Sequence, residues 1–151
     1  AERCGARVTK VESGWGNIIA PQQIAEALRT VPRPKLVALV HAETSTGVLQ
    51  NPKFITGPAH SVGAIAIMDC VTSLGALPIN LDENGVDVAF SCTQKGLSCP
   101  PGLSPVTASP MAVDRLRARQ STCPIWYLDL KLMRRSEIFR GSRGIRFGIW
   151  W

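Results

Sequence analysis

The sequence has no segment typical of a membrane span or a secretion signal. No apolar run approaches the roughly 20 residues that a helix needs to cross a bilayer. The amino terminus, Ala1 to Gly5, shows neither an initiator methionine nor a charged stretch followed by an apolar one. We therefore expect no membrane association, and the missing methionine suggests a piece of a longer protein.

Clustered metal ligands are also scarce. The five cysteines include no Cys-x-x-Cys pair, and the two histidines, His41 and His60, lie apart from any cysteine pair. A structural zinc site needs such a cluster, so we predict no metal site. The odd number of cysteines indicates reduced thiols in an intracellular protein, and we expect most of them to be small core residues.

Most of the chain shows no excess of one charge sign. Residues 1–114 carry eight Lys or Arg and nine Asp or Glu, whereas residues 115–151 carry nine against two. The formal charge of +6 therefore belongs to the end of the chain, which argues against nucleic acid as the partner of the whole chain. Residues 132–151 lack clean periodicity, and we leave them as a basic tail without a predicted fold.

The length of 151 residues and the 45% share of hydrophobic residues suit one compact domain. Strands and helices alternate, which predicts an α/β fold with a mainly parallel sheet and flanking helices. The apolar strand at 36–40 suits burial on both faces, whereas Gly57 and Pro58 weaken the helix at 52–62. Strands are predicted at 7–11, 36–40, 64–68, 86–90 and, more weakly, 105–109, and helices at 21–28, 52–62 and 111–119.

Three polar segments each follow a predicted strand, and they span residues 41–47, 69–75 and 91–96. Because the carboxyl ends of parallel strands meet at one edge, these segments should face one crevice. Asp69 follows five apolar residues, so it should be partly buried. It either serves as a counter-ion to a protonated ring nitrogen or caps the turn that follows it. Lys95 is either an enclosed, imine-forming nucleophile or a solvated loop lysine.

A family resemblance bears on these alternatives. The strings HAETSTGVLQ (41–50), DCVTSLGALPINLDENGVDV (69–88) and SCTQKGLSCPPGLSPVT (91–107) resemble the class V aminotransferases. Within that family they are most similar to the alanine–glyoxylate and serine–pyruvate or serine–glyoxylate group. The order and spacing also match, with 25 positions from Thr44 to Asp69 and 26 from Asp69 to Lys95. The resemblance covers residues 5–131.

The resemblance implies the large domain of a fold-type I enzyme and a role for each of five residues. Lys95 would form a Schiff base with pyridoxal 5'-phosphate and act as the general acid and base. Asp69 would keep the pyridine nitrogen protonated, and Val71 would pack on the ring. Thr44 would contact the cofactor near its ring oxygen, and Gln94 would contact the phosphate side. For Thr44 and Gln94, turn-forming polarity is the alternative interpretation.

The implied reaction transfers an amino group from a small amino acid, alanine or serine, to a 2-oxo acid such as glyoxylate or pyruvate, in a homodimer. A phosphoserine or aminoethylphosphonate aminotransferase, a catalytically inactive fragment and a basic-tailed binding protein are the alternatives. Cysteine desulfurases resemble the pattern less, because they place His where Gln94 stands.

Two residues near Lys95 depart from the family pattern. Cys92 stands where Gly is usual, and Gly96 stands where Cys or Ala is commoner, so we expect a looser site. The compartment is expected to be the cytoplasm, with the peroxisome as the alternative.

Parts of the family's site are expected to lie outside this chain. These are the phosphate-binding glycine and serine residues, an aromatic residue that stacks on the ring, and the substrate-binding arginine of the carboxyl-terminal small domain. We therefore interpret residues 1–131 as a partial cofactor-binding large domain, inactive or nearly so alone. A frameshift or a gene-end artefact explains residues 132–151 most simply, and a divergent tail that binds an anionic surface is the alternative.

Overall fold

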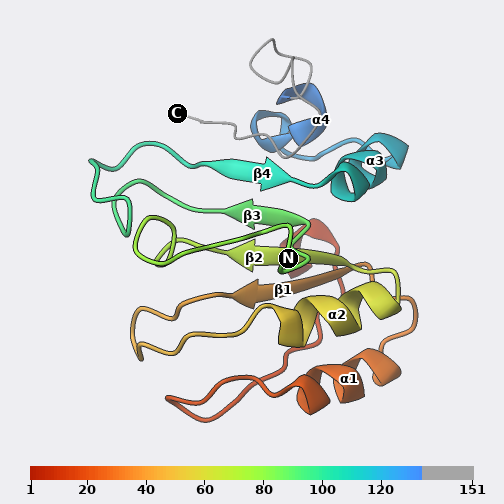
Figure 1. Ribbon diagram of the computed structural model, residues 1–151. Helices are drawn as coiled ribbons and strands as arrows, with labels where there is room; N and C mark the ends of the chain where they lie inside the picture. The colour runs from red at the N-terminus through yellow and green to blue at the C-terminus, as the bar shows by residue number, and fades with distance from the viewer. Residues whose placement is uncertain (134–151) are drawn as a thin grey trace.

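The computed structural model describes residues 1–133, so nearly all of the predicted basic tail lies outside the described residues. Strands and helices alternate along the described part of the chain (Figure 1). The strands are β1 (Leu36–Val40), β2 (Ile65–Asp69), β3 (Val88–Phe90) and β4 (Val106–Ala108). The helices are α1 (Pro21–Thr30), α2 (Lys53–Ser61), α3 (Pro110–Ala118) and α4 (Leu130–Met133), and the 3-10 helices are η1 (Glu2–Cys4) and η2 (Trp126–Leu128).

The four strands form one sheet in the order β1-β2-β3-β4. The first three strands are parallel, and β4 runs antiparallel to β3. The arrowheads of β1, β2 and β3 therefore point to the same edge of the sheet, where the loops that follow them gather (Figure 1). The predicted α/β fold with a mainly parallel sheet and flanking helices is confirmed.

The core lies between the sheet and the first two helices. Leu39, Met68 and Ala89 align across β1, β2 and β3 and are buried. Ile24 of α1 and Ile55 of α2 belong to the same buried cluster. Burying a large aliphatic side chain stabilises a fold by about 1.5 to 3 kcal/mol, so these contacts hold α1 and α2 on this face.

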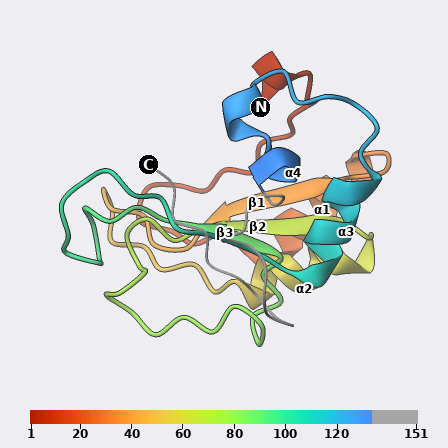
Figure 2. The ribbon, with the colours of Figure 1, turned by 90° about the horizontal axis from the view of Figure 1, so that it is seen from above.

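The opposite face of the sheet is more open. Leu36 and Val40 of β1 are 60% and 46% exposed, and Phe90 of β3 is 38% exposed. Figure 2 shows α2 and α3 on one side of the sheet, and α4 with the amino-terminal segment on the other. The prediction that residues 36–40 are covered on both faces therefore holds for one face only, within residues 1–133.

Three further expectations need correction. Residues 7–11 form no strand, because this segment is almost wholly exposed and pairs with no part of the sheet. α2 forms in spite of Pro58, which removes only the hydrogen bond to the carbonyl of residue 54, because the buried side chains of Ile55, Thr56 and Ala59 hold the helix on the sheet. Of the five cysteines, all free, only Cys70 is buried.

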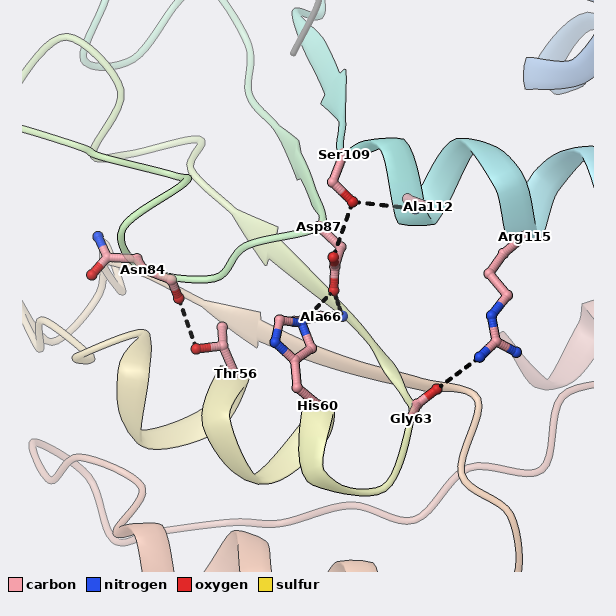
Figure 3. Close-up of polar contacts among 9 residues, drawn as sticks. All are labelled: Thr56, His60, Gly63, Ala66, Asn84, Asp87, Ser109, Ala112 and Arg115. Carbon is pink, nitrogen blue, oxygen red and sulfur yellow. Dashed lines mark hydrogen bonds and ion pairs between the residues drawn. The ribbon is translucent and has the colours of Figure 1, made fainter. Parts of the chain in front are cut away.

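A buried carboxylate organises the edge of the sheet where β2 and β3 begin (Figure 3). Asp87 Oδ2 accepts hydrogen bonds from Ala66 N at 2.8 Å and from His60 Nε2 of α2 at 2.7 Å. Its Oδ1 accepts a hydrogen bond from the Ser109 hydroxyl at 3.0 Å, and Ser109 Oγ caps α3 by accepting from Ala112 N. Asp87 thus joins β2, β3, α2 and α3.

None of the helices formed by residues 1–133 combines the length and the apolar character that a bilayer crossing requires. The same residues form no group of three or more His, Cys, Asp or Glu side chains placed to hold a metal ion.

Candidate functional site

The loops after β1, β2 and β3 meet at the edge of the sheet opposite Asp87. The loop after β1 begins with His41, whose N–H donates to the Asp69 carbonyl at 3.0 Å. The loop after β2 begins with Cys70, whose N–H donates to the Phe90 carbonyl at 2.8 Å. These hydrogen bonds extend the ladder beyond the strands, so the three predicted polar segments start side by side.

Asp69 ends β2 and is half-buried, as expected for a carboxylate after an apolar strand. Its Oδ1 accepts a hydrogen bond from Val71 N at 2.8 Å, which caps the turn. Within residues 1–133 its Oδ2 has no hydrogen-bond partner. Oδ1 therefore caps the turn, as the second interpretation of Asp69 expects, while Oδ2 is available to a cationic group of a ligand.

Thr44 and Thr72 join the first two loops through their hydroxyl groups, whose oxygens lie 2.5 Å apart. Thr44 is exposed and Thr72 is half-buried. The neighbouring turn is fixed by Ser45, whose backbone N–H and hydroxyl both donate to Glu43 Oε1 and so lower the pKa of the Glu43 carboxyl. Thr44 thus presents its hydroxyl at the open side of the edge.

The loop that carries Lys95 packs on the loop after Asp69 through two glycines. A β-carbon on Gly96 would lie 2.8 Å from the Thr72 carbonyl oxygen and would also collide with the carbonyl oxygen of Leu74. A β-carbon on Gly75, which has φ +87°, would lie 2.8 Å from the Gly96 carbonyl oxygen. We expected Gly96 to loosen the site, but its missing side chain instead allows the close approach of the two loops.

The side chains of Gln94 and Lys95 are exposed. Ser98 N donates to the Lys95 carbonyl at 2.8 Å and closes a turn, while the Lys95 amine has no hydrogen-bond or ion-pair partner within residues 1–133. Of the two interpretations of Lys95, the described part of the chain shows the exposed side chain and no enclosure. What this part supplies is the position of the lysine, next to the loops of Thr44 and Asp69.

Two buried groups lie beneath these loops. His41 is buried and its Nδ1 lies 2.8 Å from the hydroxyl of the fully buried Ser73, and burial lowers the pKa of His41. Burial, with a smaller effect of the Asp69 charge, raises the pKa of the Cys70 thiol to about 11. A neutral imidazole and a protonated thiol suit a supporting layer better than a reacting one.

A cavity of about 80 Å³ lies beside β3 and β4 and is mainly apolar, and Cys70, Leu74 and Ser91 of the polar segments are among its lining residues. Thr44, Gln94 and Lys95 are not among its lining residues, so it is not the crevice predicted from the sequence. Thr107 lines it with a hydroxyl that is buried and has no hydrogen-bond partner in the described part of the chain.

The edge therefore combines a half-buried carboxylate, an exposed amine, a pair of hydroxyls and an amide on three adjoining loops. Comparison with known proteins decides the family, because the model of the class V aminotransferases matches residues 1–122. The chain belongs to the class V aminotransferases. Its match covers the segments that carry all five candidate residues, Thr44, Asp69, Val71, Gln94 and Lys95.

Three of the proteins to which the chain is similar are named as transaminases or aminotransferases. The (S)-ureidoglycine–glyoxylate transaminase of Bacillus subtilis is 38% identical over 80% of this chain and 29% of its own length. The alanine–glyoxylate aminotransferase of Oryctolagus cuniculus is 36% identical over 87% of this chain and 33% of its own length. The crystal structure of an alanine–glyoxylate aminotransferase from Nostoc sp. superposes with a TM-score of 0.84 at 40% identity, covering 95% of this chain and 38% of that one.

The chain thus spans about a third of the length of these three relatives.

Sequence reasoning missed the residues that join the loops after β1, β2 and β3, namely Thr72, Ser73 and Gly75. A signal was available, since these small or polar residues follow Asp69 directly at the end of a strand.

Proposed function

We propose that the chain supplies the lysine-bearing part of a pyridoxal 5'-phosphate site in an aminotransferase. The observation that carries this proposal is the meeting of three loops at one edge of the sheet. The Thr44 and Thr72 hydroxyls join the first two loops, and Gly96 packs on Thr72 to bring in the third. Thr44, Asp69 and Lys95 are thereby held on one surface.

The residues at this edge fit the cofactor. When bound, pyridoxal phosphate supplies an aldehyde that condenses with amines and a ring that accepts electron density from the substrate carbon. The Oδ2 of Asp69, which has no partner within residues 1–133, would accept a hydrogen bond from a protonated ring nitrogen, while Oδ1 keeps the carboxylate fixed to Val71 N. The half-buried Val71 side chain lies next in the chain and supplies an apolar surface for a ring.

Lys95 supplies the reacting amine. Its Nζ would form the covalent link to the aldehyde, and after release by a substrate amine it would carry a proton between carbon atoms. No carboxylate within residues 1–133 pairs with this amine, so it is not held away from a ligand. Gln94, exposed beside it, offers an amide N–H to the phosphate side of the cofactor.

For the substrates, we propose a small amino acid donor, alanine or serine, and glyoxylate as the 2-oxo acid, with pyruvate as the second candidate. Glyoxylate occurs in the names of both relatives described above, whereas their amino donors differ. The parent enzyme is proposed to be a homodimer in the cytoplasm. Because the chain spans about a third of these relatives, we expect little or no turnover from the chain alone.

The cofactor assignment is tested by trapping the covalent link. The 151-residue chain is incubated with increasing concentrations of pyridoxal phosphate and reduced with borohydride, and the modified lysines are identified by peptide mass spectrometry. Lys53 of α2 is the matched control, because its side chain is also exposed but lies outside the three loops. We expect Lys95 to be modified at much lower cofactor concentrations than Lys53. Equal modification of the two lysines would contradict the proposal.

A further inference from the structure

We infer that Thr72 is a positioning residue, which orients the Thr44 hydroxyl toward the ligand. This inference rests on the proposed function and adds a residue that the sequence patterns did not assign. Its basis is the hydroxyl pair at the open end of the three loops, in which the exposed Thr44 meets the half-buried Thr72.

The chemistry of the pair sets the direction of its hydrogens. Each hydroxyl has one hydrogen to donate and two lone pairs to accept. If the half-buried Thr72 donates to Thr44, the hydrogen of Thr44 is left to point away from the pair, toward the open side. A hydroxyl that already accepts one hydrogen bond is also the stronger donor, because hydrogen bonds in a chain polarise one another. With Thr72 as the donor, Thr44 becomes a directed donor to an oxygen of the ligand.

The backbone around Thr72 is fixed on both sides, so its hydroxyl can serve as a reference point. The preceding turn is held by Val71 N, which donates to Asp69 Oδ1 at 2.8 Å. The carbonyl of Thr72 itself lies against Gly96 of the lysine loop. Thr72 therefore links, through separate atoms, the segments that bear Thr44, Asp69 and Lys95.

A merely structural role would leave a different signature. A hydrogen bond between partly exposed hydroxyls contributes little to the stability of a fold, because water can replace either partner. Loss of the Thr72 hydroxyl should thus change the melting temperature little. Its loss should instead change how the site binds pyridoxal phosphate, which can be read by the trapping of Lys95 rather than by turnover.

The experiment compares four single variants of the 151-residue chain, and the double variant Thr44→Val with Thr72→Val, with the unaltered chain. Thr72→Val removes the hydroxyl at nearly constant shape, Thr72→Ser retains it, and Thr44→Val removes its partner. Thr107→Val is the matched control, because the Thr107 hydroxyl has no hydrogen-bond partner in the described part of the chain and lines a cavity that Thr44, Thr72 and Lys95 do not line. The readouts are the pyridoxal phosphate concentration for half-maximal trapping of Lys95 and the melting temperature.

We expect Thr72→Val to raise the half-trapping concentration several-fold, while Thr72→Ser and Thr107→Val resemble the unaltered chain. Because Thr72 acts through Thr44, adding Thr72→Val to Thr44→Val should cause no further rise. Unchanged trapping in Thr72→Val, or a fully additive effect in the double variant, would overturn the positioning role alone. Failure of the unaltered chain to trap Lys95 ahead of Lys53 would instead overturn the proposed function, and this inference with it.

Discussion

Gly96 and Thr72 approach so closely that a β-carbon on Gly96 would lie 2.8 Å from the Thr72 carbonyl oxygen. A real β-carbon essentially never comes within 3.0 Å of a heavy atom outside its own residue and its two chain neighbours. Here the close atom belongs to the backbone, which cannot turn aside as a side chain can. The distance between the loop that follows Asp69 and the loop that carries Lys95 is thus set by the absence of a side chain.

Gly96→Ala should therefore push the two loops apart and raise the pyridoxal phosphate concentration needed to trap Lys95. Gly57→Ala is the matched control, since Gly57 lies in α2 with open space around its missing β-carbon. That control should be neutral or stabilise the fold by roughly 0.5 to 1 kcal/mol, because alanine favours a helix more than glycine does. Unaltered Lys95 trapping in Gly96→Ala would show that the close contact does not position the lysine.

Two variants of Asp69 separate its turn-capping contact from its charge. Asn keeps an oxygen that accepts the hydrogen bond from Val71 N but loses the negative charge. Ala loses both the hydrogen-bond acceptor and the charge. We expect both variants to weaken the trapping of Lys95 and only Asp69→Ala to lower the melting temperature. If Asp69→Asn traps the cofactor like the unaltered chain, Asp69 is a turn cap and not the counter-ion of the ring.

The buried His41 should make the stability of the chain depend on pH. Burial lowers the pKa of His41 below 6.5, so the unfolded chain binds its proton at a higher pH than the folded chain does. The free energy of unfolding should thus fall as the pH drops below about 6.5, and be unaffected by His41 above that value. Urea denaturation between pH 5 and pH 8 measures this, and His41→Asn should remove its part of the slope. Parallel pH curves for the two proteins would refute the assignment.

Asp87 and His60 should contribute unequally to stability, although they form one hydrogen-bonded pair. The Asp87 side chain is 5% exposed and holds three donors, whereas the His60 side chain is 35% exposed. Asp87→Ala leaves buried donors without a partner and should cost about 3 kcal/mol or more. His60→Ala leaves Asp87 with its other two donors and should cost about 1 kcal/mol. A larger loss for His60→Ala in urea denaturation would contradict this ranking.

The cysteines should differ in reactivity. Cys4 and Cys99 are exposed, whereas Cys70 is buried and its pKa is raised to about 11, so little thiolate forms near neutral pH. Iodoacetamide at pH 8 should therefore modify Cys4 and Cys99 quickly and Cys70 only after urea is added. Peptide mass spectrometry over time checks the order, and early modification of Cys70 in the folded chain would show that the loop above it opens.

The class of fold, most of the helices and strands, and the family could be read from the amino-acid sequence alone. Apolar runs and helix patterns depend on neighbouring residues, so the strand at residues 36–40 and the helix from residue 21 could be predicted locally. The three strings around Thr44, Asp69 and Lys95 identified the family because their order and spacing are themselves sequence properties. The same reasoning placed Asp69 in a half-buried position at the end of its strand, as observed.

The contacts between loops required the three-dimensional structure, because they depend on distances that spacing along the chain does not encode. Sequence reasoning took Gly96 as a source of looseness, yet it is the point where two backbones touch. It left Asp87, His60 and Thr72 unassigned, since their partners lie 21 or more positions away in the chain. It left open whether Lys95 is enclosed or solvated, and residues 1–133 leave that side chain exposed. To enclose Lys95, further polypeptide would have to cover the open side of this edge of the sheet. To position Lys95, the loops that this chain contains are sufficient.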